Sequence, residues 1–353
     1  MQHIKYGQAM EWLFSNIGQR AVKVISGMRG CGKTTLLQMF RAALEEKGNG
    51  PVLSYDLDCE DALPLLAEGA LEAAVRTAVQ PGIHPVVLLD EVPAQPQFLA
   101  VLDRLAFDMG CDVYAAFSGA WNAPEQITAL FSGRHVKFDM MPLSFAEYRS
   151  CLSGGRKSSS VQAGKAAFGT YLQHGSFPCM VPHAGDAEAS RRLMRLLFSS
   201  AMYHDVLMRS GLTDAAILME VARGMTASLG SPISPASISR ELSLRGKKID
   251  PKTADRYLWA LAGSLIMQPV QRMNLRSGEV LSTRCRYYAS EPAMLPLCSG
   301  GVQVPEKAVL ENVVYENIAL SGISVNGDPV TKDTAVLHAD TVRNLTFDGE
   351  TLC

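Results

Sequence analysis

The sequence predicts an α/β fold with a parallel sheet over residues 1–150, followed by a mainly helical region. In the first part, short β-rich stretches alternate with helical ones, which indicates a parallel sheet covered by helices on both faces. One of these stretches, residues 85–89 (PVVLL), is apolar throughout. A continuously apolar strand is typical of a sheet that is buried on both faces.

Each element of this part has its own signal. Residues 34–46 place Leu36, Leu37, Phe40 and Leu44 on one side, the spacing of an amphipathic helix. Residues 61–79 are rich in Ala and Leu and are also predicted to be helical. The full expectation is strands at residues 21–26, 52–55, 85–89, 113–118 and 135–138, with helices at residues 34–46, 61–79 and 98–109.

The composition limits the classes of protein that the chain can belong to. Of its 353 residues, 47% are hydrophobic and 19% are charged, and the net charge is −2. These values exclude a disordered chain and a uniformly basic nucleic-acid coat. No apolar run approaches the ~18 residues of a membrane helix, and the first residues lack a signal-peptide pattern. The eight cysteines form no C-x-x-C pair, so we expect reduced thiols, a cytoplasmic location and no membrane partner.

Residues 27–34 read GMRGCGKT, which fits the pattern G-x-x-x-x-G-K-[ST] between a predicted strand and a predicted helix. The glycines allow successive backbone N–H groups to face a phosphate, and the following helix adds its positive end. Lys33 is expected to reach the β- and γ-phosphates of ATP, and Thr34 to ligate Mg²⁺. The predicted nucleotide-binding residues are Gly27, Met28, Arg29, Gly30, Cys31, Gly32, Lys33, Thr34 and Thr35.

Two acids end the third predicted strand, in VVLLDE at residues 86–91. If the strands are parallel, this strand end faces the phosphate loop. Asp90 is then expected to hold Mg²⁺, and Glu91 to act as the base for an attacking water. The order of loop strand, intervening strand and acidic strand is that of P-loop ATPases with an additional catalytic glutamate. The acid pair therefore favours hydrolysis over phosphoryl transfer.

Two further polar residues are candidate catalytic residues. Ser118 ends the fourth predicted strand, and Arg134 precedes the fifth. Ser118 is expected to contact the γ-phosphate or the water, unless it is only a polar strand end. Arg134 is a candidate arginine finger, acting in cis or on a neighbouring subunit, with a surface arginine as the alternative.

Several motifs in order resemble the AAA-family ATPases of bacteria and archaea that carry a C-terminal domain of unknown function. The ATPase motifs are GMRGCGKTTLL, VVLLDEV and SGRHVKFDMMPLSFAEY, and the later echoes are YLQHGSFP, HDVLMRSGLTD, RYYASEPAM and LENVVYENI. The resemblance covers roughly residues 1–320. Family members continue into a domain related to the PD-(D/E)XK nuclease fold. The last residues here, GDPVTKDTAVLHADTVRNLTFDGETLC, match none of its pattern, so we expect that domain to be truncated or divergent.

The expected organisation has four parts: a P-loop ATPase domain at residues 1–150, a linker and helical segment at 151–213, a winged helix at 214–297, and a C-terminal remnant at 298–353. Residues 151–297 carry a net charge of +8, whereas residues 1–150 and residues 298–353 carry −5 each. A winged helix can place its third helix in a DNA groove, or it can pack as a regulatory part. The candidate DNA-binding residues are Lys247, Lys248, Lys252, Thr253, Arg256, Arg272 and Arg276.

The leading hypothesis is an ATPase that hydrolyses ATP to ADP and phosphate and moves a winged-helix arm. One alternative is a DNA-binding regulator for which ATP is only a conformational ligand. Another is a non-catalytic, nucleotide-dependent scaffold that recruits a protein client or forms a homo-oligomer. A small-molecule kinase fits least, because no acceptor-binding motif is evident.

Overall fold

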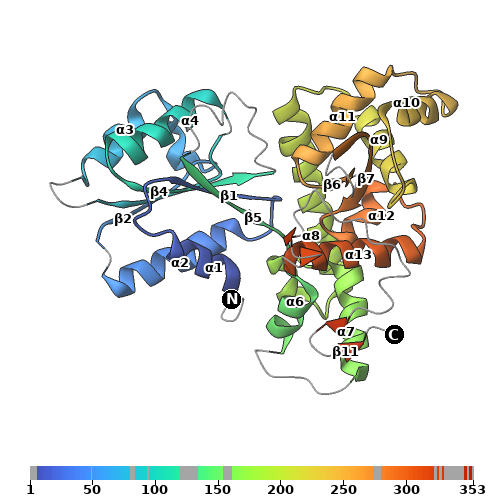
Figure 1. Cartoon of the computed structure of the whole chain (residues 1–353), viewed down its shortest axis with the longest axis horizontal. Coiled ribbons are helices and arrows are strands. Elements are labelled where there is room, and N and C mark those ends of the chain that lie inside the picture. Colours follow the sequence, from blue (N-terminus) through green and yellow to red (C-terminus); the bar gives the residue numbers. More distant parts are fainter. Residues whose placement is uncertain are drawn as a thin grey trace. The chain divides into compact units, whose positions relative to one another are not determined.

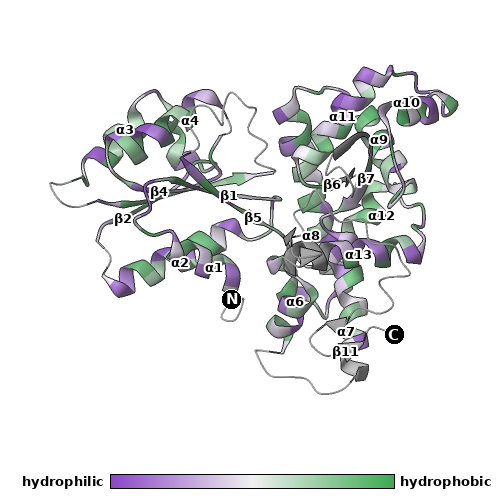
Figure 2. Ribbon diagram, in the orientation of Figure 1, coloured by the Kyte–Doolittle hydropathy of each residue, from purple (hydrophilic) through white to green (hydrophobic). Residues whose placement is uncertain are grey.

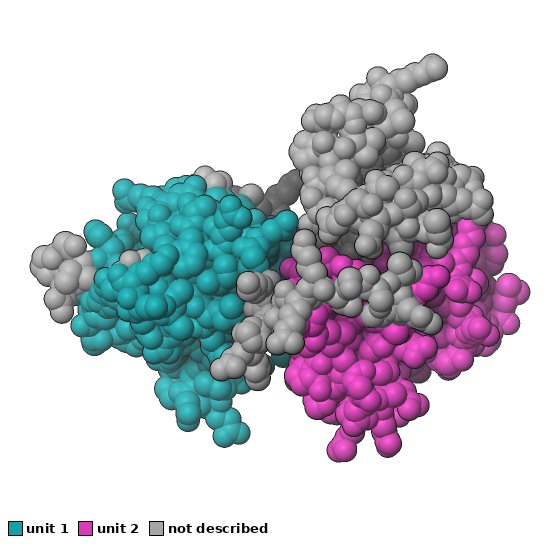
Figure 3. Space-filling model, turned by 90° about the horizontal axis from the view of Figure 1, so that it is seen from below, with its two compact units in different colours: residues 1–141 teal, residues 142–353 magenta. Residues whose placement is uncertain are grey.

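The structure is a computed structural model that describes residues 6–48, 50–79, 84–93, 95–119, 134–153, 161–273 and 280–321. It also describes four two-residue strands, β8 (Ser324–Val325), β9 (Asp328–Pro329), β10 (Thr346–Phe347) and β11 (Glu350–Thr351). The chain divides into two compact units, Met1–Met141 and Pro142–Cys353, which Figure 3 colours separately.

The first unit is built on a five-stranded parallel sheet in the order β2-β3-β4-β1-β5. Its strands are β1 (Val22–Gly27), β2 (Val52–Asp56), β3 (Val86–Asp90), β4 (Asp112–Ser118) and β5 (His135–Met140). Every pairing in the sheet is parallel. All five predicted strands are present, and β1 and β3 are buried over their whole length, as the apolar run in β3 indicated.

Helices cover both faces of this sheet. Helices α1 (Gly7–Ser15) and α2 (Lys33–Lys47) lie on one face, and α3 (Ala70–Arg76) and α4 (Pro96–Asp103) lie on the other (Figure 1). Helices α2 and α3 each carry both hydrophobic and hydrophilic residues (Figure 2), as expected for helices that pack on a sheet on one side only.

The predicted helix at residues 61–79 is interrupted in the structure. A 3₁₀ segment, η1 (Glu60–Leu66), comes first, and α3 begins only after Gly69. Pro64 lies inside η1 and Gly69 has a φ of +75°. Proline removes a helical hydrogen-bond donor, and a left-handed glycine breaks the helical path. The predicted helix at residues 98–109 likewise ends in a π-helical turn, η2 (Arg104–Asp108).

The second unit begins with helices α6 (Phe145–Leu152) and α7 (Val161–His174), the 3₁₀ segment η3 (Pro178–His183), and α8 (Ala187–Ser200), which continues as the π-helical η4 (Ala201–Met208). A capping box starts α6: the Ser144 hydroxyl accepts from the Glu147 N–H at 3.3 Å, and the Glu147 carboxylate accepts from the Ser144 N–H at 2.9 Å. The Pro-Leu-Ser-Phe motif is therefore a helix start.

Three helices and an antiparallel strand pair follow. They are α9 (Ala215–Ala227), α10 (Pro235–Leu244), α11 (Pro251–Gly263), β6 (Met267–Met273) and β7 (Val280–Ala289). Side chains at the N-caps, Asp214, Ser234 and Asp250, accept backbone N–H bonds and fix the three helix starts. A single β-bridge joins Ile233, just before α10, to Cys285 in β7.

The strand pair is followed by η5 (Pro292–Met294), α12 (Leu295–Cys298) and α13 (Glu306–Ser321), and α13 packs against β7. The Asn312 side chain pairs with the backbone of Ala289, accepting from its N–H at 2.6 Å and donating to its C=O at 2.9 Å. Among the described residues, no helix is long and apolar enough to cross a membrane.

A buried carboxylate connects two motifs of the second unit that lie far apart in the sequence. Glu291 is 1% exposed. One of its oxygens accepts from the N–H and the hydroxyl of Ser176, at 2.7 and 2.6 Å, and the other accepts from the Ala293 N–H at 3.0 Å. Burial raises the pKa of this carboxyl, and the hydrogen bonds oppose the rise. The motifs around Ser176 and Glu291 therefore meet in the folded unit.

Candidate nucleotide-binding site

The Gly-rich loop joins the carboxyl end of β1 to the start of α2. Gly30 and Gly32 have φ angles of +87° and +103°. Residues with a Cβ atom rarely adopt this region of backbone conformation. These two positions therefore need glycine. A third glycine, Gly119, follows β4 and donates its N–H to the Gly27 carbonyl at 2.8 Å, which fixes the start of the loop to the neighbouring strand.

Gly27 is required for space. A Cβ at this position would lie 2.8 Å from the Cys31 sulfur and would also collide with the carbonyl oxygen of Met140. Cys31 is fully buried, and burial raises the pKa of its thiol. Cys31 therefore packs under the loop as a neutral side chain.

Lys33 folds back into the loop. It is 3% exposed, and its Nζ donates to the carbonyl oxygens of Gly27 and Met28 at 3.2 and 3.3 Å and to the Ser118 hydroxyl at 3.1 Å. Because the ammonium group has these polar partners, its burial is compensated. A positive charge is therefore held at the centre of the loop, where a phosphate would bind.

Asp90 lies at the carboxyl end of β3 with one oxygen satisfied and one not. Its Oδ1 accepts from the Glu91 N–H at 3.0 Å, and its side chain is hydrogen-bonded to Thr34. Its Oδ2 is buried and has no hydrogen-bond partner in the described part of the chain. Burial raises the pKa of the carboxyl above its ordinary value of 3.8. An unsatisfied buried carboxylate oxygen beside a threonine hydroxyl fits a hard divalent cation such as Mg²⁺.

Glu91 has an unusual backbone and a crowded carboxylate. Its φ is +49°, which is uncommon for a side-chain-bearing residue. One carboxylate oxygen accepts from the Ser118 hydroxyl at 2.8 Å and lies 3.7 Å from Lys33 Nζ. The other lies 3.8 Å from Arg29 Nη2. The strained turn thus directs the carboxylate back toward the phosphate loop.

Ser118 connects the two central charges of the site. Its hydroxyl accepts from Lys33 and donates to Glu91, and the side chain is buried at the end of β4. The structure thus brings Lys33, Asp90, Glu91 and Ser118 together, as the strand-end positions predicted. Thr34, exposed in the first turn of α2, and Thr35 complete the predicted loop residues.

One contact of this site involves a residue that no sequence motif marks. Asp58 lies two residues beyond β2, and its carboxylate is 3.4 Å from Arg29 Nη1. The available signal was its position, because the carboxyl ends of parallel strands share one edge of a sheet.

Arg134 is not part of the site that these residues form. It precedes β5, and its carbonyl accepts from the N–H of Val22 at the start of β1, so it lies at the amino edge of the sheet, opposite the loop. There its guanidinium is 3.3 Å from Asp103 and 3.6 Å from the ring centroid of Phe107. This position gives no support to the expectation that Arg134 contacts the γ-phosphate in cis. Its action on a neighbouring subunit stays a prediction.

The predicted DNA-binding residues divide into three groups. Lys247, Lys248, Lys252 and Arg256 are exposed at and before α11, and none of these four forms an ion pair within the described ranges. The Thr253 hydroxyl is instead part of the N-terminal cap of α11, because it donates a hydrogen bond to the Asp250 carboxylate at 2.8 Å. The Arg272 side chain and all of Arg276 lie outside the described residues.

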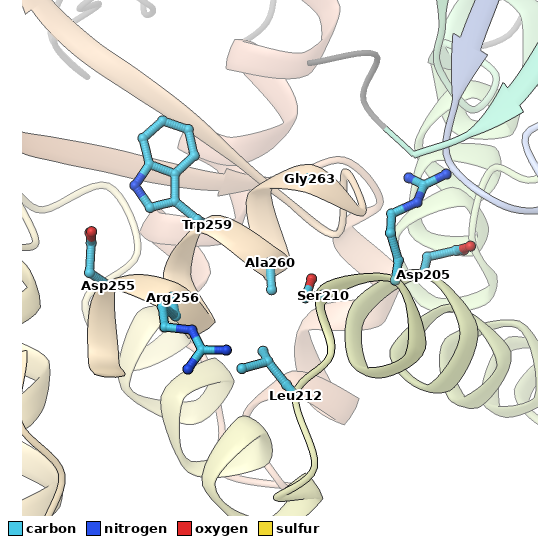
Figure 4. A pocket seen from close by; sticks show the side chains of 9 residues that line it. Asp205, Ser210, Leu212, Asp255, Arg256, Trp259, Ala260 and Gly263 are labelled. Atoms are coloured by element: carbon cyan, nitrogen blue, oxygen red, sulfur yellow. The ribbon is translucent and has the colours of Figure 1, made fainter. Parts of the chain in front are cut away.

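A shallow pocket of about 300 Å³ lies between α11 and the end of η4. Its lining includes Arg256, Trp259 and Leu212, and Figure 4 shows the Arg256 guanidinium directed toward Leu212. Trp259 is 59% exposed. Lys252, Arg256 and Trp259 follow one another at helical spacing, so they share one face of α11.

The first unit is an α/β P-loop NTPase fold, defined by the parallel sheet, the loop after β1 and the acid at the end of β3. Residues 19–149 match the family described as "AAA domain". Residues 165–300 match a domain of unknown function, DUF8612.

A Haemophilus influenzae protein described as uncharacterized is 24% identical over 278 residues, which cover 76% of this chain and 66% of that protein. The matched region thus spans slightly less than two thirds of that relative. Among solved structures, AMPPCP-bound DnaA from Aquifex aeolicus has a TM-score of 0.38 at 14% identity, covering 72% of this chain and 86% of DnaA. Cdc6p from Pyrobaculum aerophilum has a TM-score of 0.35 at 14% identity, covering 90% and 96%. Likenesses at this level carry no conclusion about function.

Proposed function

We propose that the first unit binds ATP with Mg²⁺ and hydrolyses it to ADP and phosphate. The observation that carries this proposal is the chain of contacts from Lys33 through Ser118 to Glu91, at hydrogen-bond distances of 3.1 and 2.8 Å. In this proposal, Lys33 is the cation that binds phosphate and Glu91 is the general base, and both side chains belong to one small site at the carboxyl edge of the sheet. The match of residues 19–149 to the AAA domain supports the same interpretation.

The roles follow from the positions of the side chains. Backbone N–H groups of the loop and the start of α2 would receive the phosphates, and Lys33 would contact the β- and γ-phosphates. Thr34 and the unsatisfied Oδ2 of Asp90 would hold Mg²⁺, which when bound neutralises charge on the phosphate oxygens. Asp90 is shielded from solvent, so its charge would be felt strongly by the cation.

Glu91 would accept the proton of the attacking water. The water oxygen forms a bond to the γ-phosphorus, the bond from that phosphorus to the bridging oxygen of ADP breaks, and the proton passes to Glu91. Ser118 donates a hydrogen bond to Glu91 and so orients the carboxylate. When Lys33 binds a phosphate and gives up its contacts with Ser118 and Glu91, the hydrogen bond from Ser118 would keep Glu91 near the reaction centre.

Hydrolysis would be coupled to movement in the second unit. We interpret α9, α10, α11 and the β6–β7 pair as a winged helix, because three helices are followed by an antiparallel hairpin and the stretch before α10 bridges to β7. The proposal includes a movement of this arm, and either a protein client or assembly into a homo-oligomer.

The exposed cations of α11 favour a second candidate function, an ATP-responsive DNA-binding protein. Lys247, Lys248, Lys252 and Arg256 are exposed and are available to phosphates, because their charges are not neutralised by acids in the described part of the chain. Trp259 on the same face offers an aromatic surface.

Replacing Lys33 tests nucleotide binding directly. Lys33→Ala removes the loop's only described ammonium group, and we expect ATP affinity to fall at least ~100-fold, because the variant cannot form a charge-assisted hydrogen bond to phosphate at a desolvated site. Lys47→Ala, at the other end of α2 and exposed, is the matched control. Titration of both variants with Mg²⁺-ATP by calorimetry measures the effect. Equal ATP affinity in Lys33→Ala and Lys47→Ala would contradict the assignment of the loop.

A further inference from the structure

Arg29 is the one arginine within the phosphate loop, and it extends to two carboxylates. Its Nη1 lies 3.4 Å from Asp58 Oδ2 and its Nη2 lies 3.8 Å from Glu91 Oε2. Its side chain is 23% exposed, so it lies over the site and is not packed into the core. The guanidinium thus spans the loop, the end of β2 and the proposed catalytic base.

Two cations face the Glu91 carboxylate from its two oxygens. Lys33 Nζ is 3.7 Å from Oε1 and Arg29 Nη2 is 3.8 Å from Oε2. Both cations therefore converge on one anion beside the loop. A γ-phosphate bound by Lys33 would bring a larger negative charge to this place, and its oxygens match the planar fork of a guanidinium better than a single carboxylate oxygen at 3.8 Å.

The ion pair between Arg29 and Asp58 is weak. Asp58 is 66% exposed, and exposed ion pairs contribute little free energy. Its position is nevertheless defined, since the Asp58 N–H donates to Asp56 Oδ1 at 3.1 Å. Asp58 thus has a defined position but binds Arg29 weakly, and a more highly charged anion can replace it as the partner of Arg29.

We propose that Arg29 is a catalytic arginine supplied in cis by the loop itself. It leaves Glu91 and Asp58 when ATP binds and contacts the γ-phosphate, where it stabilises the charge that develops as the phosphoryl group transfers to water. The exchange also removes one of the two cations that lie beside Glu91 among the described residues, so that the carboxylate can take the proton of the water. After phosphate leaves, ADP offers no γ-oxygen, and Arg29 returns to the two carboxylates.

This inference rests on the proposed ATP hydrolysis and assigns to Arg29 the charge-stabilising role that the sequence suggested for Arg134. A contact to the γ-phosphate alone has a specific consequence. It should matter for turnover and for ATP affinity, and hardly at all for ADP affinity, because ADP lacks the group that is contacted.

The test compares Arg29→Ala and Arg29→Lys with wild type and with Arg41→Ala, an exposed arginine on the outer side of α2. Steady-state phosphate release gives kcat and KM, and calorimetry gives the affinities for ADP and for a non-hydrolysable ATP analogue. For Arg29→Ala we expect kcat to fall at least ~100-fold, since arginines that act on a transferring phosphoryl group contribute factors of this size or more. ADP affinity should stay within about threefold of wild type, while affinity for the analogue falls about tenfold.

Arg29→Lys separates charge from geometry and guards against a folding defect. It keeps the positive charge but not the two-pronged donor, so we expect a kcat between those of wild type and Arg29→Ala. A kcat in Arg29→Ala within about threefold of wild type, or above it, would overturn the proposal, because Arg29 would then be a spectator or only a restraint on Glu91. If wild type and Arg41→Ala themselves release no phosphate, the proposed hydrolysis is wrong and the role of Arg29 fails with it.

Discussion

The buried position of Asp90 changes the pKa of its carboxyl and, with it, the pH dependence of stability. Burial raises the pKa of this carboxyl, so the folded protein holds the proton more tightly than the unfolded chain does. The free energy of unfolding therefore falls as pH rises from the ordinary value of 3.8 through the raised pKa. A bound cation would reverse this effect, because it stabilises the ionised form.

Asp90→Asn should therefore stabilise the protein when no metal is present. In EDTA and without nucleotide, we expect the stability difference between the variant and wild type to grow in the variant's favour as pH is raised from 4 to 8, because only wild type then holds a buried charge at this position. Urea unfolding of both proteins across this range measures it. With Mg²⁺-ATP the order should reverse. A variant that is less stable than wild type at pH 7 in EDTA would show that the folded state does not disfavour the charge.

The phosphate-binding residues of the loop could be predicted because they lie close together in the sequence. The spacing of glycines, Lys33 and Thr34 within residues 27–34, and the acids after an apolar strand, are visible without knowledge of the fold. The position of Arg134 needed the sheet edges to be assigned, since a residue before a parallel strand lies opposite the loop. The contact of Arg29 with Asp58 needed the strand order, which the sequence does not state.

At the scale of single elements, α11 is the clearest candidate for a surface that binds nucleic acid. The double variant Lys252→Ala, Arg256→Ala removes two exposed cations from one helix face. If they bind phosphates, the slope of log affinity against log salt should become shallower by ~0.9 for each cation that no longer neutralises a phosphate. Fluorescence anisotropy with duplex DNA at several salt concentrations measures this slope.

The control for α11 is a similar cation elsewhere in the second unit. Lys165 is exposed on α7, and Lys165→Ala should leave both affinity and salt slope unchanged. Identical slopes for wild type and the double variant, or no salt-dependent binding by wild type, would remove DNA from the function of this helix.

The elements that sequence patterns located best were the buried strands and the amphipathic helices. Strand β3 was found from an unbroken apolar run, and α2 from apolar residues at helical spacing. The π-helical turns η2 and η4 extend α4 and α8, and no sequence period distinguishes them from α-helix. A π-turn differs from an α-turn only in the spacing of its backbone hydrogen bonds, which the period of apolar residues does not reveal.

At the scale of the whole molecule, the second unit is held together by contacts between distant segments. Ser176 and Glu291 are 115 residues apart in sequence, yet Ser176 supplies two of the three described hydrogen bonds to the buried carboxylate. This contact joins the segment after α7 to the segment after β7.

Ser176→Ala removes the hydroxyl donor and leaves the backbone donor in place. We expect stability to fall by ~1.5–3 kcal/mol, the value of a hydrogen bond to a charged group, measured by urea unfolding. Ser150→Ala, at an exposed position on α6, is a matched serine control that should change stability by less than ~0.5 kcal/mol. A cost for Ser176→Ala as small as that of the control would mean that Glu291 is satisfied without the hydroxyl.

The sequence predicts four parts, whereas the structure divides the chain into two compact units. The structure groups residues 142–353 into one unit, and the contacts of Glu291 and Asn312 show why segments from α7 to α13 pack together. The predicted boundaries at 213 and 297 and the truncation of the last domain stay predictions, since most of residues 322–353 lie outside the described part.

The central claim, ATP hydrolysis with Glu91 as the base, is tested most directly by phosphate release from saturating Mg²⁺-ATP by wild type and Glu91→Gln. Glutamine preserves the size of the side chain and can still accept from Ser118, but it cannot take the proton of the water. We predict that Glu91→Gln binds ATP as tightly as wild type or more tightly, while phosphate release falls at least ~100-fold. Release by Glu91→Gln at the wild-type rate would contradict the account.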